Sequence, residues 1–505
     1  MSRLSKNILY NLFGQLLLVG LGFVATRYVF RQLGEDALGI IYFTLTLNAV
    51  LSSVFGMGIA ETTVREVSGH LATEPDYISD LIRTASFLYW GVYLLFAVAL
   101  YYSAPLLVYR WITLKELGPD VAIRVVRVLG IACFVALPRS FYASLLCGLQ
   151  RMEFNNIIDV SASALQQLGI VVILSAGGGL LPVAYWMSAC YALAIGGYLL
   201  VCARFFSWHV LVPGFLRGVV ARNIGYTSHM AMISLLAIIH MQADKVIVSK
   251  LLPIGLFGLY TVASGAVSRS SSIAVAIFQG AFPHLSALNN AQQRPGMLSQ
   301  YRKLQDLVCF TTLPLFAAVI FAAKPLFTLL FNAEAARLLL LPVVFLCLGF
   351  YMNGALTIPY AFSLADGRPD ISARSNFYAL FIVLPVTTLL VHFFALNGAG
   401  FSWVWYHLFA YTYAVPRICR ECLATSTWGW YVHVFKPMAL GCATYGAAWL
   451  FLASAGQHSI LPLTLMYVLA SCLFLLGSFA WIGTELRGSA FSLVRKFRSK
   501  YAEVV

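Results

Sequence analysis

Long apolar runs constrain the fold of this chain more than any other feature. Runs of about twenty apolar residues recur from Ile8 to Trp481, and short clusters of Gly, Pro or charged residues separate them. That length lets an α-helix cross the hydrocarbon core of a bilayer. The runs lack the alternation of apolar and polar residues that is typical of a membrane β-barrel. We count fourteen runs, which predict an all-α integral membrane protein with about 14 transmembrane helices.

The composition agrees with a membrane protein. Of the 505 residues, 60% are hydrophobic and only 10% are charged, and the mean hydropathy is +0.83. Soluble domains are about half apolar and a quarter charged. The segments between the apolar runs are too short to form domains of their own, so we expect the function to lie among the helices.

The net charge of +14 reflects membrane topology. With a cytoplasmic N-terminus and fourteen alternating helices, 21 of the 33 Lys and Arg residues fall on the cytoplasmic side, seven on the opposite side and five within spans. This bias follows the positive-inside rule and predicts that both termini are cytoplasmic. We therefore expect no nucleic acid partner, and we expect the basic tail over residues 487–500 to contact anionic membrane lipids.

Motifs for metal or nucleotide binding are missing from the sequence. Cys419 and Cys422 form a lone C-x-x-C without a second ligand pair nearby, so we predict no metal site. The sequence has no Gly-Lys dipeptide, which excludes a Walker A loop and direct use of ATP. Uphill transport would then need an ion gradient, with Na⁺ or H⁺ as the coupling ion and no cofactor.

A short internal repeat suggests two lobes. The segment from Arg31 matches the segment from Lys250 at an offset of 219 residues, and Gly39 then corresponds to Gly258. A repeat after six helices predicts two lobes of the same orientation, related by a pseudo-two-fold axis along the membrane normal. We expect an N-lobe over residues 1–205, a C-lobe over residues 206–424, and two extra helices with a basic tail over residues 425–505. The site is expected in the cavity between the lobes.

Several ordered motifs resemble one known family, the polysaccharide transporters or O-antigen type oligosaccharide flippases. Its superfamily also contains multidrug extruders and the peptidoglycan lipid flippase. The motifs are "NLFGQ", "LGEDALGIIYF", "TVREVSGH", "LLCGLQRMEF", "QADKVIVSKLLPIGLFGLYTVAS" and "FPHLSAL". The resemblance covers almost the whole chain, in the order and spacing of the family. The resemblance implies fourteen helices in two lobes, in agreement with the count from hydropathy.

Arg269 is the most informative single residue, because it stands in the middle of "YTVASGAVSRSSSIAVAIF", residues 260–278, which otherwise predict one continuous membrane-spanning helix. A central Arg costs about 2.5 to 3.5 kcal/mol to insert, so it should face protein or water and meet an anion. The functional interpretation is an anion site. The structural alternative is a permanent salt bridge to Asp244 or Glu61.

The first helix carries a polar stripe. Asn7, Asn11 and Gln15 recur every four residues and so share one helical face, which should point toward the protein interior. Arg27 lies near the other end of this helix. The resemblance implies that Arg27, Arg65 and Arg269 bind the pyrophosphate of a lipid-linked sugar. Two alternatives stay open: Arg27 could extend to the outer headgroups, and Arg65 could pair with Glu66.

Candidates for ion coupling are Asp244, His240 one turn before it, and Glu61. A proton or Na⁺ could bind such a group within a span. The alternative for Asp244 is an ion pair with the adjacent Lys245. For Asp159 we expect only a charge near the start of a helix.

We therefore expect a flippase that moves a polyprenyl-diphosphate-linked oligosaccharide to the outer face of a bacterial inner membrane by alternating access. It would serve O-antigen, exopolysaccharide or capsule synthesis and break no bond, so it would not be an enzyme. A polysaccharide polymerase and glycosyltransferases are the expected protein partners. The alternatives are a multidrug cation antiporter of the same fold, which the basic intramembrane set Arg27, Arg139, Lys245, Arg269 and Lys324 argues against, and a membrane glycan polymerase or ligase.

Overall fold

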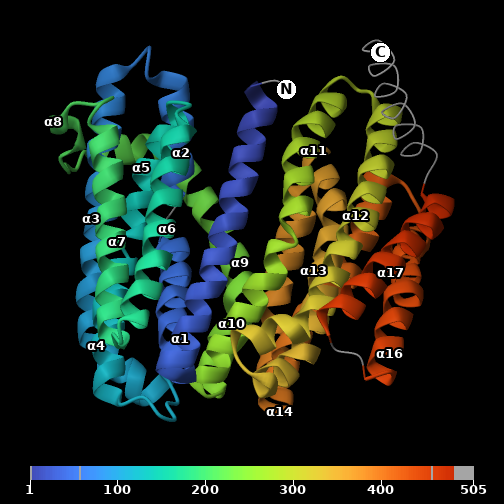
Figure 1. Cartoon of the computed structure of the whole chain (residues 1–505). Coiled ribbons are helices and arrows are strands. Elements are labelled where there is room, and N and C mark those ends of the chain that lie inside the picture. The colour runs from blue at the N-terminus through green and yellow to red at the C-terminus, as the bar shows by residue number, and fades with distance from the viewer. Residues whose placement is uncertain (1–2, 56–57, 457–458, 483–505) are drawn as a thin grey trace, which may run out of the picture. The chain divides into compact units, whose positions relative to one another are not determined.

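The structure is a computed structural model that describes residues 3–55, 58–456 and 459–482 (Figure 1). Over these residues the chain is helical, and its only β-type pairing is an isolated bridge between Thr113 and Pro253. The all-α membrane fold predicted from the apolar runs is confirmed.

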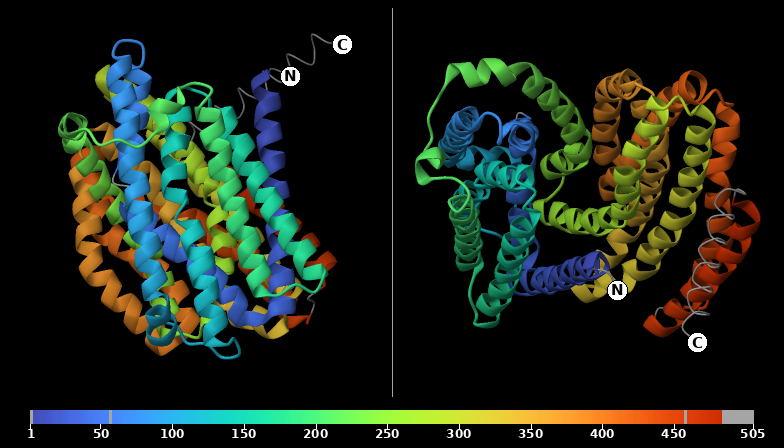
Figure 2. Two further views of the ribbon diagram at one scale, coloured as in Figure 1. Left: turned by 90° about the vertical axis from the view of Figure 1, so that its left-hand side faces the viewer. Right: turned by 90° about the horizontal axis from the view of Figure 1, so that it is seen from above.

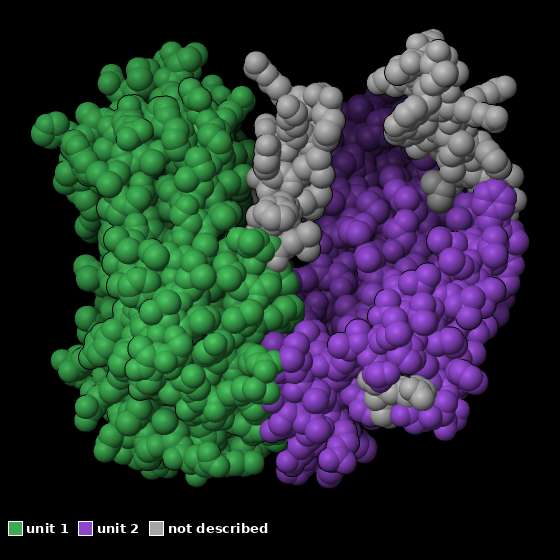
Figure 3. Space-filling model, viewed as in Figure 1, with its two compact units in different colours: residues 1–261 green, residues 262–505 purple. Residues whose placement is uncertain are grey.

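The chain forms two compact units, residues 1–261 and residues 262–505 (Figure 3). The first unit contains α1 to α9 with the π-helical segment η1, and α10 runs across the boundary. The bounds are α1 Arg3–Phe55, α2 Ile59–His70, α3 Pro75–Leu106, η1 Leu107–Trp111, α4 Pro119–Cys133, α5 Ala136–Gly148, α6 Met152–Ser175, α7 Leu180–Cys202, α8 Trp208–Leu211, α9 Arg217–Leu251 and α10 Ile254–Arg269.

The second unit contains α11 to α17 and two further π-helical segments, η2 and η3. Their bounds are α11 Ser272–Asn290, α12 Arg294–Leu330, α13 Ala333–Ala365, α14 Pro369–Arg417, η2 Ile418–Leu423, α15 Thr427–Gly441, η3 Cys442–Gly446, α16 Ala447–Ser454 and α17 Ile460–Trp481. The lobe boundaries predicted at residues 205 and 424 remain a prediction.

Eight helical segments of the described chain are long and apolar enough to cross a membrane, and a ninth span results if the bent pair α10 and α11 is counted as one. Many of their large apolar side chains are exposed, including Leu95, Phe393 and Leu476. Exposed apolar surface of this extent marks a lipid-facing protein. The chain is a multi-pass membrane protein, and the number fourteen stays a prediction.

Two of the longest helices are interrupted. In α1 the backbone leaves helical geometry at Gly34, with φ 85° and ψ 179°. Glycine adopts such a positive φ without a steric cost, so the chain turns there. Just after the turn, one carboxylate oxygen of Asp36 accepts backbone N–H groups from Lys115 at 2.7 Å, Glu116 at 2.8 Å and Leu117 at 3.1 Å. This part of the "LGEDALG" motif therefore fixes the loop before α4. The second interruption is at Ala395 in α14, with φ 48°.

Each unit has its own apolar core. In the first unit the core lies among α2, α3, α5, α7, α8 and α9, around residues such as Tyr89, Phe141 and Tyr198. In the second it lies among α11 to α15 and η2, around residues such as Phe362 and Tyr411. Figure 2 shows most helices of each unit from the side and nearly along their axes. The cores hold helices together inside each unit, while the outward faces remain apolar for lipid.

Candidate functional site

Arg269 lies at a break in a membrane span. The sequence predicted one uninterrupted helix over residues 260–278, and that prediction is wrong at Ser270 and Ser271, where α10 ends and α11 starts in a direction 43° away. Arg269 is the last residue of α10 and its side chain is exposed. An exposed guanidinium at a break within an apolar span is a charge that can meet a ligand from outside the helix.

The serines next to Arg269, which are Ser268, Ser270, Ser271 and Ser272, explain the break. The N–H groups of Ser270 and Ser271 bond to the carbonyl oxygens three residues earlier, each at 3.0 Å, so the last turn of α10 tightens. The hydroxyl of Ser272 donates to the carbonyl oxygen of Arg269 at 2.7 Å. Serine hydroxyls that bond to nearby backbone groups compete with helical hydrogen bonds and bend helices. The signal was visible in the sequence as four serines around one arginine.

Asp244 is the best-defined acidic group among the predicted coupling residues. It lies in α9 with its side chain only 3% exposed. Tyr260, in α10, donates its hydroxyl to one carboxylate oxygen of Asp244 at 2.6 Å, and the Nζ of Lys245 lies 3.7 Å from the other. The structure thus contains the alternative Lys245 pair and adds Tyr260, which sequence reasoning missed. His240 is half-buried one turn earlier on the same helix.

Glu61 and Arg65 lie on α2, and both side chains are exposed. The guanidinium of Arg65 contacts the buried carboxylate of Glu66, with its Nε at 2.9 Å. Glu66 also accepts the hydroxyl of Tyr77 at 3.2 Å. The ion pair considered as the alternative for Arg65 is therefore present, and any role of Arg65 in binding would have to coexist with it.

Arg27 is half-buried in the first segment of α1. Next to it, Thr26 is buried and its hydroxyl lies 3.3 Å from that of Tyr42 in the second segment of the same helix. The backbone of residues 7–15 is helical, but the side chains of Asn7, Asn11 and Gln15 lie outside the described residues. The polar stripe on this helix stays a prediction.

Two of the intramembrane cations are engaged by carboxylates. The Nη2 of Arg139, in α5, lies 2.6 Å from Asp159 of α6, and Tyr198 of α7 donates its hydroxyl to the same carboxylate oxygen at 2.9 Å. Asp159 therefore joins three helices, and Lys245 is close to Asp244. Since both charges are compensated inside the protein, they contribute little to the argument for an anionic cargo.

Another acidic group escaped the sequence analysis. Asp306 in α12 is buried, and the Nε2 of His433 in α15 lies 2.7 Å from one of its oxygens. Near it, Trp430 donates its indole N–H to the hydroxyl of Tyr301 at 3.0 Å. No spacing motif in the sequence links residues 127 positions apart, so only the fold could reveal this pair. Among the described residues, no group of three or more His, Cys, Asp or Glu side chains is arranged to hold a metal ion.

Comparisons with known proteins identify the family. Residues 4–289, more than half of the chain, match the family described as polysaccharide biosynthesis proteins. The chain belongs to this family. Over 414 residues it is 21% identical to a "Putative O-antigen transporter" from Shigella flexneri, an alignment that covers 79% of this chain and 93% of that protein. The resemblance inferred from the ordered motifs is confirmed.

Solved structures of other proteins share the fold of this polysaccharide biosynthesis protein. The lipid II flippase MurJ in an inward closed conformation matches with a TM-score of 0.69 at 12% identity, over 92% of this chain and 98% of MurJ. An inward-facing multidrug transporter of the MATE family matches with a TM-score of 0.66 at 13% identity, over 79% of this chain and 94% of that one. At these identities the likeness concerns the fold alone.

Proposed function

We propose that this polysaccharide biosynthesis protein is a flippase for a polyprenyl-diphosphate-linked oligosaccharide. It moves the sugar and its diphosphate from the cytoplasmic to the outer face of a bacterial inner membrane, with both termini in the cytoplasm, and it breaks no bond. The family assignment, the similarity to an O-antigen transporter and the shared flippase fold support a polysaccharide precursor as cargo.

The observation that carries the proposal is Arg269 at the break between α10 and α11. A guanidinium is charged at every physiological pH and can bind two phosphate oxygens at once. The break leaves this charge exposed instead of packing it along a continuous helix. Arg269 is proposed to bind the diphosphate, with Arg27 and Arg65 as further contacts, while the polyprenyl chain stays in the bilayer.

Transport by alternating access needs a source of free energy, and an ion gradient is proposed to supply it. Asp244 is the leading candidate for the coupling site because it is a buried carboxylate with a hydroxyl donor, Tyr260, and a cation, Lys245, close by. Protonation or Na⁺ binding would compete directly with the Lys245 ammonium for the carboxylate. His240 and Glu61 remain further candidates, and H⁺ and Na⁺ are the two ions to test.

The test is flipping of a fluorescent diphosphate-linked oligosaccharide lipid in proteoliposomes. Native protein is compared with Arg269→Ala and Arg269→Gln at equal amounts of folded protein. Arg337→Gln is the matched control, because Arg337 is also an exposed arginine of the second unit. The expected result is flipping by native protein and the control, with a loss of about tenfold or more in both Arg269 variants, since a charge-assisted contact is worth about 1.5 to 3 kcal/mol.

Three outcomes are informative. Normal flipping by both Arg269 variants would remove that residue from the substrate site. Inert native protein that instead exchanges organic cations would establish the antiporter alternative. Release of free polymer or of the diphosphate carrier would establish a polymerase or ligase.

A further inference from the structure

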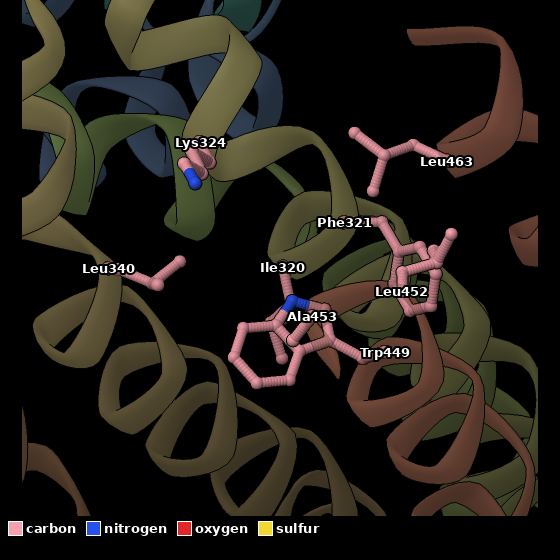
Figure 4. Close-up of a pocket in the computed structure, with 8 residues that line it drawn as sticks. All are labelled: Ile320, Phe321, Lys324, Leu340, Trp449, Leu452, Ala453 and Leu463. Carbon is pink, nitrogen blue, oxygen red and sulfur yellow. The ribbon is translucent and has the colours of Figure 1, made fainter. Parts of the chain in front are cut away.

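Lys324 is an intramembrane cation in a small apolar pocket that the proposed flippase activity does not use. It lies in α12, six residues before that helix ends at Leu330, and it lines a pocket of about 140 Å³ within the second unit. Figure 4 shows the pocket, which four helices line: α12, α13, α16 and α17. The other lining residues are all apolar: Ile320, Phe321, Leu340, Trp449, Leu452, Ala453 and Leu463.

The charge of Lys324 differs in its surroundings from those of Arg139 and Lys245. Arg139 is held by Asp159, and Lys245 lies close to Asp244, whereas no acidic side chain in the described part of the chain forms a salt bridge with Lys324. A cation in an apolar span is costly unless an anion or water reaches it. At 1.5 Å per residue, Lys324 is about 9 Å from the end of α12, within the reach of a long side chain toward a lipid headgroup.

A second pocket continues the first along the same seam. It has a volume of about 190 Å³ and shares Phe321 and Leu463 with the Lys324 pocket. Ala318 and Ala322 lie one turn apart on α12 and leave the room that this pocket occupies, and Tyr467 and Ile460 of α17 close its other side. Both pockets are smaller than the roughly 300 to 1,000 Å³ of sites for whole drug-sized ligands. Their size and apolar lining suit segments of a hydrocarbon chain.

The surroundings of the two pockets are exposed to lipid. Leu450 and Phe451 on α16, and Leu461 and Leu465 on α17, are large apolar side chains with exposed surfaces. In a membrane these faces contact acyl chains, so lipid is present at the seam at high concentration. The seam combines one positive charge, Lys324, with two pockets the size of acyl-chain segments on this lipid-facing surface.

We infer that the seam between α12, α16 and α17 binds an anionic phospholipid of the bilayer. Its phosphate pairs with the ammonium of Lys324, and one acyl chain lies in the two pockets on either side of Phe321. The bound lipid joins α16 and α17 to α12 by filling space that protein side chains leave open. This lipid is a structural ligand and is distinct from the diphosphate-linked cargo.

The experiment measures retention and stabilisation by lipid in detergent solution. Purified protein is mixed with phosphatidylglycerol or with phosphatidylcholine of the same acyl chains, and the melting temperature and the bound lipid, counted by native mass spectrometry, are recorded. We expect phosphatidylglycerol to raise the melting temperature of native protein by about 2 °C or more over phosphatidylcholine. Lys324→Gln should abolish this difference, and Lys324→Arg should retain it.

Lys303→Gln is the matched control, because Lys303 is a half-buried lysine on the same helix that lines neither pocket. It should behave as native protein does. Ala322→Leu keeps the charge but fills the second pocket, so it should weaken lipid retention even if Lys324→Gln fails to fold. Equal effects of the two lipids, an undiminished preference in Lys324→Gln or in Ala322→Leu, or equal protection by soluble glycerol phosphate would each overturn the inference.

Discussion

Gly39 and Gly258 lie against each other, and a Cβ atom built on Gly258 would be only 2.8 Å from the Cα of Gly39. These are the two glycines that correspond in the internal repeat at an offset of 219 residues. Two elements related by a two-fold axis meet through equivalent residues where they cross that axis. Such a contact is what the repeat predicts, and the repeat, which rests on a few matched residues, stays a prediction.

The first prediction concerns this crossing. Gly258→Ala should lower the stability by about 1 to 3 kcal/mol or prevent folding, because the added methyl group meets backbone atoms of α1 that cannot rotate away. Gly39→Ala should be at least as severe, since its Cβ would clash with the carbonyl oxygen of Ile254. Thermal denaturation monitored by size-exclusion chromatography measures both.

The control for the crossing is Gly265→Ala on the same helix, where a Cβ meets no atom within 4 Å. It should leave the melting temperature unchanged or raise it, because alanine favours helix over glycine. If Gly258→Ala has the same melting temperature as Gly265→Ala, then α1 and α10 do not approach each other as closely as these distances require.

The second prediction separates support from coupling at Asp244. Tyr260→Phe removes the buried hydroxyl that donates to the carboxylate, so we expect a loss of about 1 to 3 kcal/mol in stability. Tyr185→Phe, on an exposed tyrosine, should have no effect. If Asp244 is the coupling group, folded Asp244→Asn should still equilibrate cargo across the membrane but lose its response to an imposed H⁺ or Na⁺ gradient. A normal gradient response in Asp244→Asn would leave the carboxylate with a structural role only.

The sequence predicted the class of fold and the family because both depend on signals repeated along the chain. Each of these signals combines evidence from many residues: the twenty-residue apolar runs, the distribution of Arg and Lys, and the ordered motifs. The sequence failed where a single local competition decided the outcome. The helix break at Ser270 and Ser271 depends on which carbonyl oxygen accepts a hydrogen bond from each N–H group. The average hydropathy of the run does not report this choice.

The charged groups also divide into pairs that the sequence could suggest and pairs that only the fold reveals. Adjacent pairs such as Arg65 with Glu66, and Lys245 with Asp244, could be considered from the sequence because neighbours in the chain are close in any fold. The pair of Asp306 and His433 could not, because packing of α15 on α12 creates it. The role of Asp36 in holding the loop before α4 was hidden for the same reason.

The third prediction tests whether Arg139 is structural. Its guanidinium is held by Asp159, which also accepts a hydrogen bond from Tyr198, so Arg139→Gln should lower stability by about 1 kcal/mol and leave flipping per folded molecule unchanged. The double variant Arg139→Gln with Asp159→Asn should lose less than the sum of the two single variants, because neither charge is then left without its partner. Loss of flipping without loss of stability in Arg139→Gln would contradict a purely structural role and indicate that Arg139 contacts the substrate.

The fourth prediction concerns pH and a contact outside the membrane spans. Arg222 bonds to both carboxylate oxygens of Glu74, at 2.6 and 3.1 Å, and its guanidinium lies 3.8 Å from the centre of the Tyr77 ring. The hydrogen bond from Arg222 lowers the pKa of the Glu74 carboxyl below its ordinary value. A carboxyl whose pKa is lower in the folded state contributes stability above its unfolded pKa and loses it as the pH falls through the folded value.

The melting temperature of native protein should therefore exceed that of Glu74→Gln by a constant margin at neutral pH, and this margin should shrink only below about pH 4.5. The double variant Glu74→Gln with Arg222→Gln shows whether the margin arises from this pair, because further removal of Arg222 should then add no pH dependence. A margin that declines between pH 7 and 6 would show that a group other than the Glu74 carboxyl controls it.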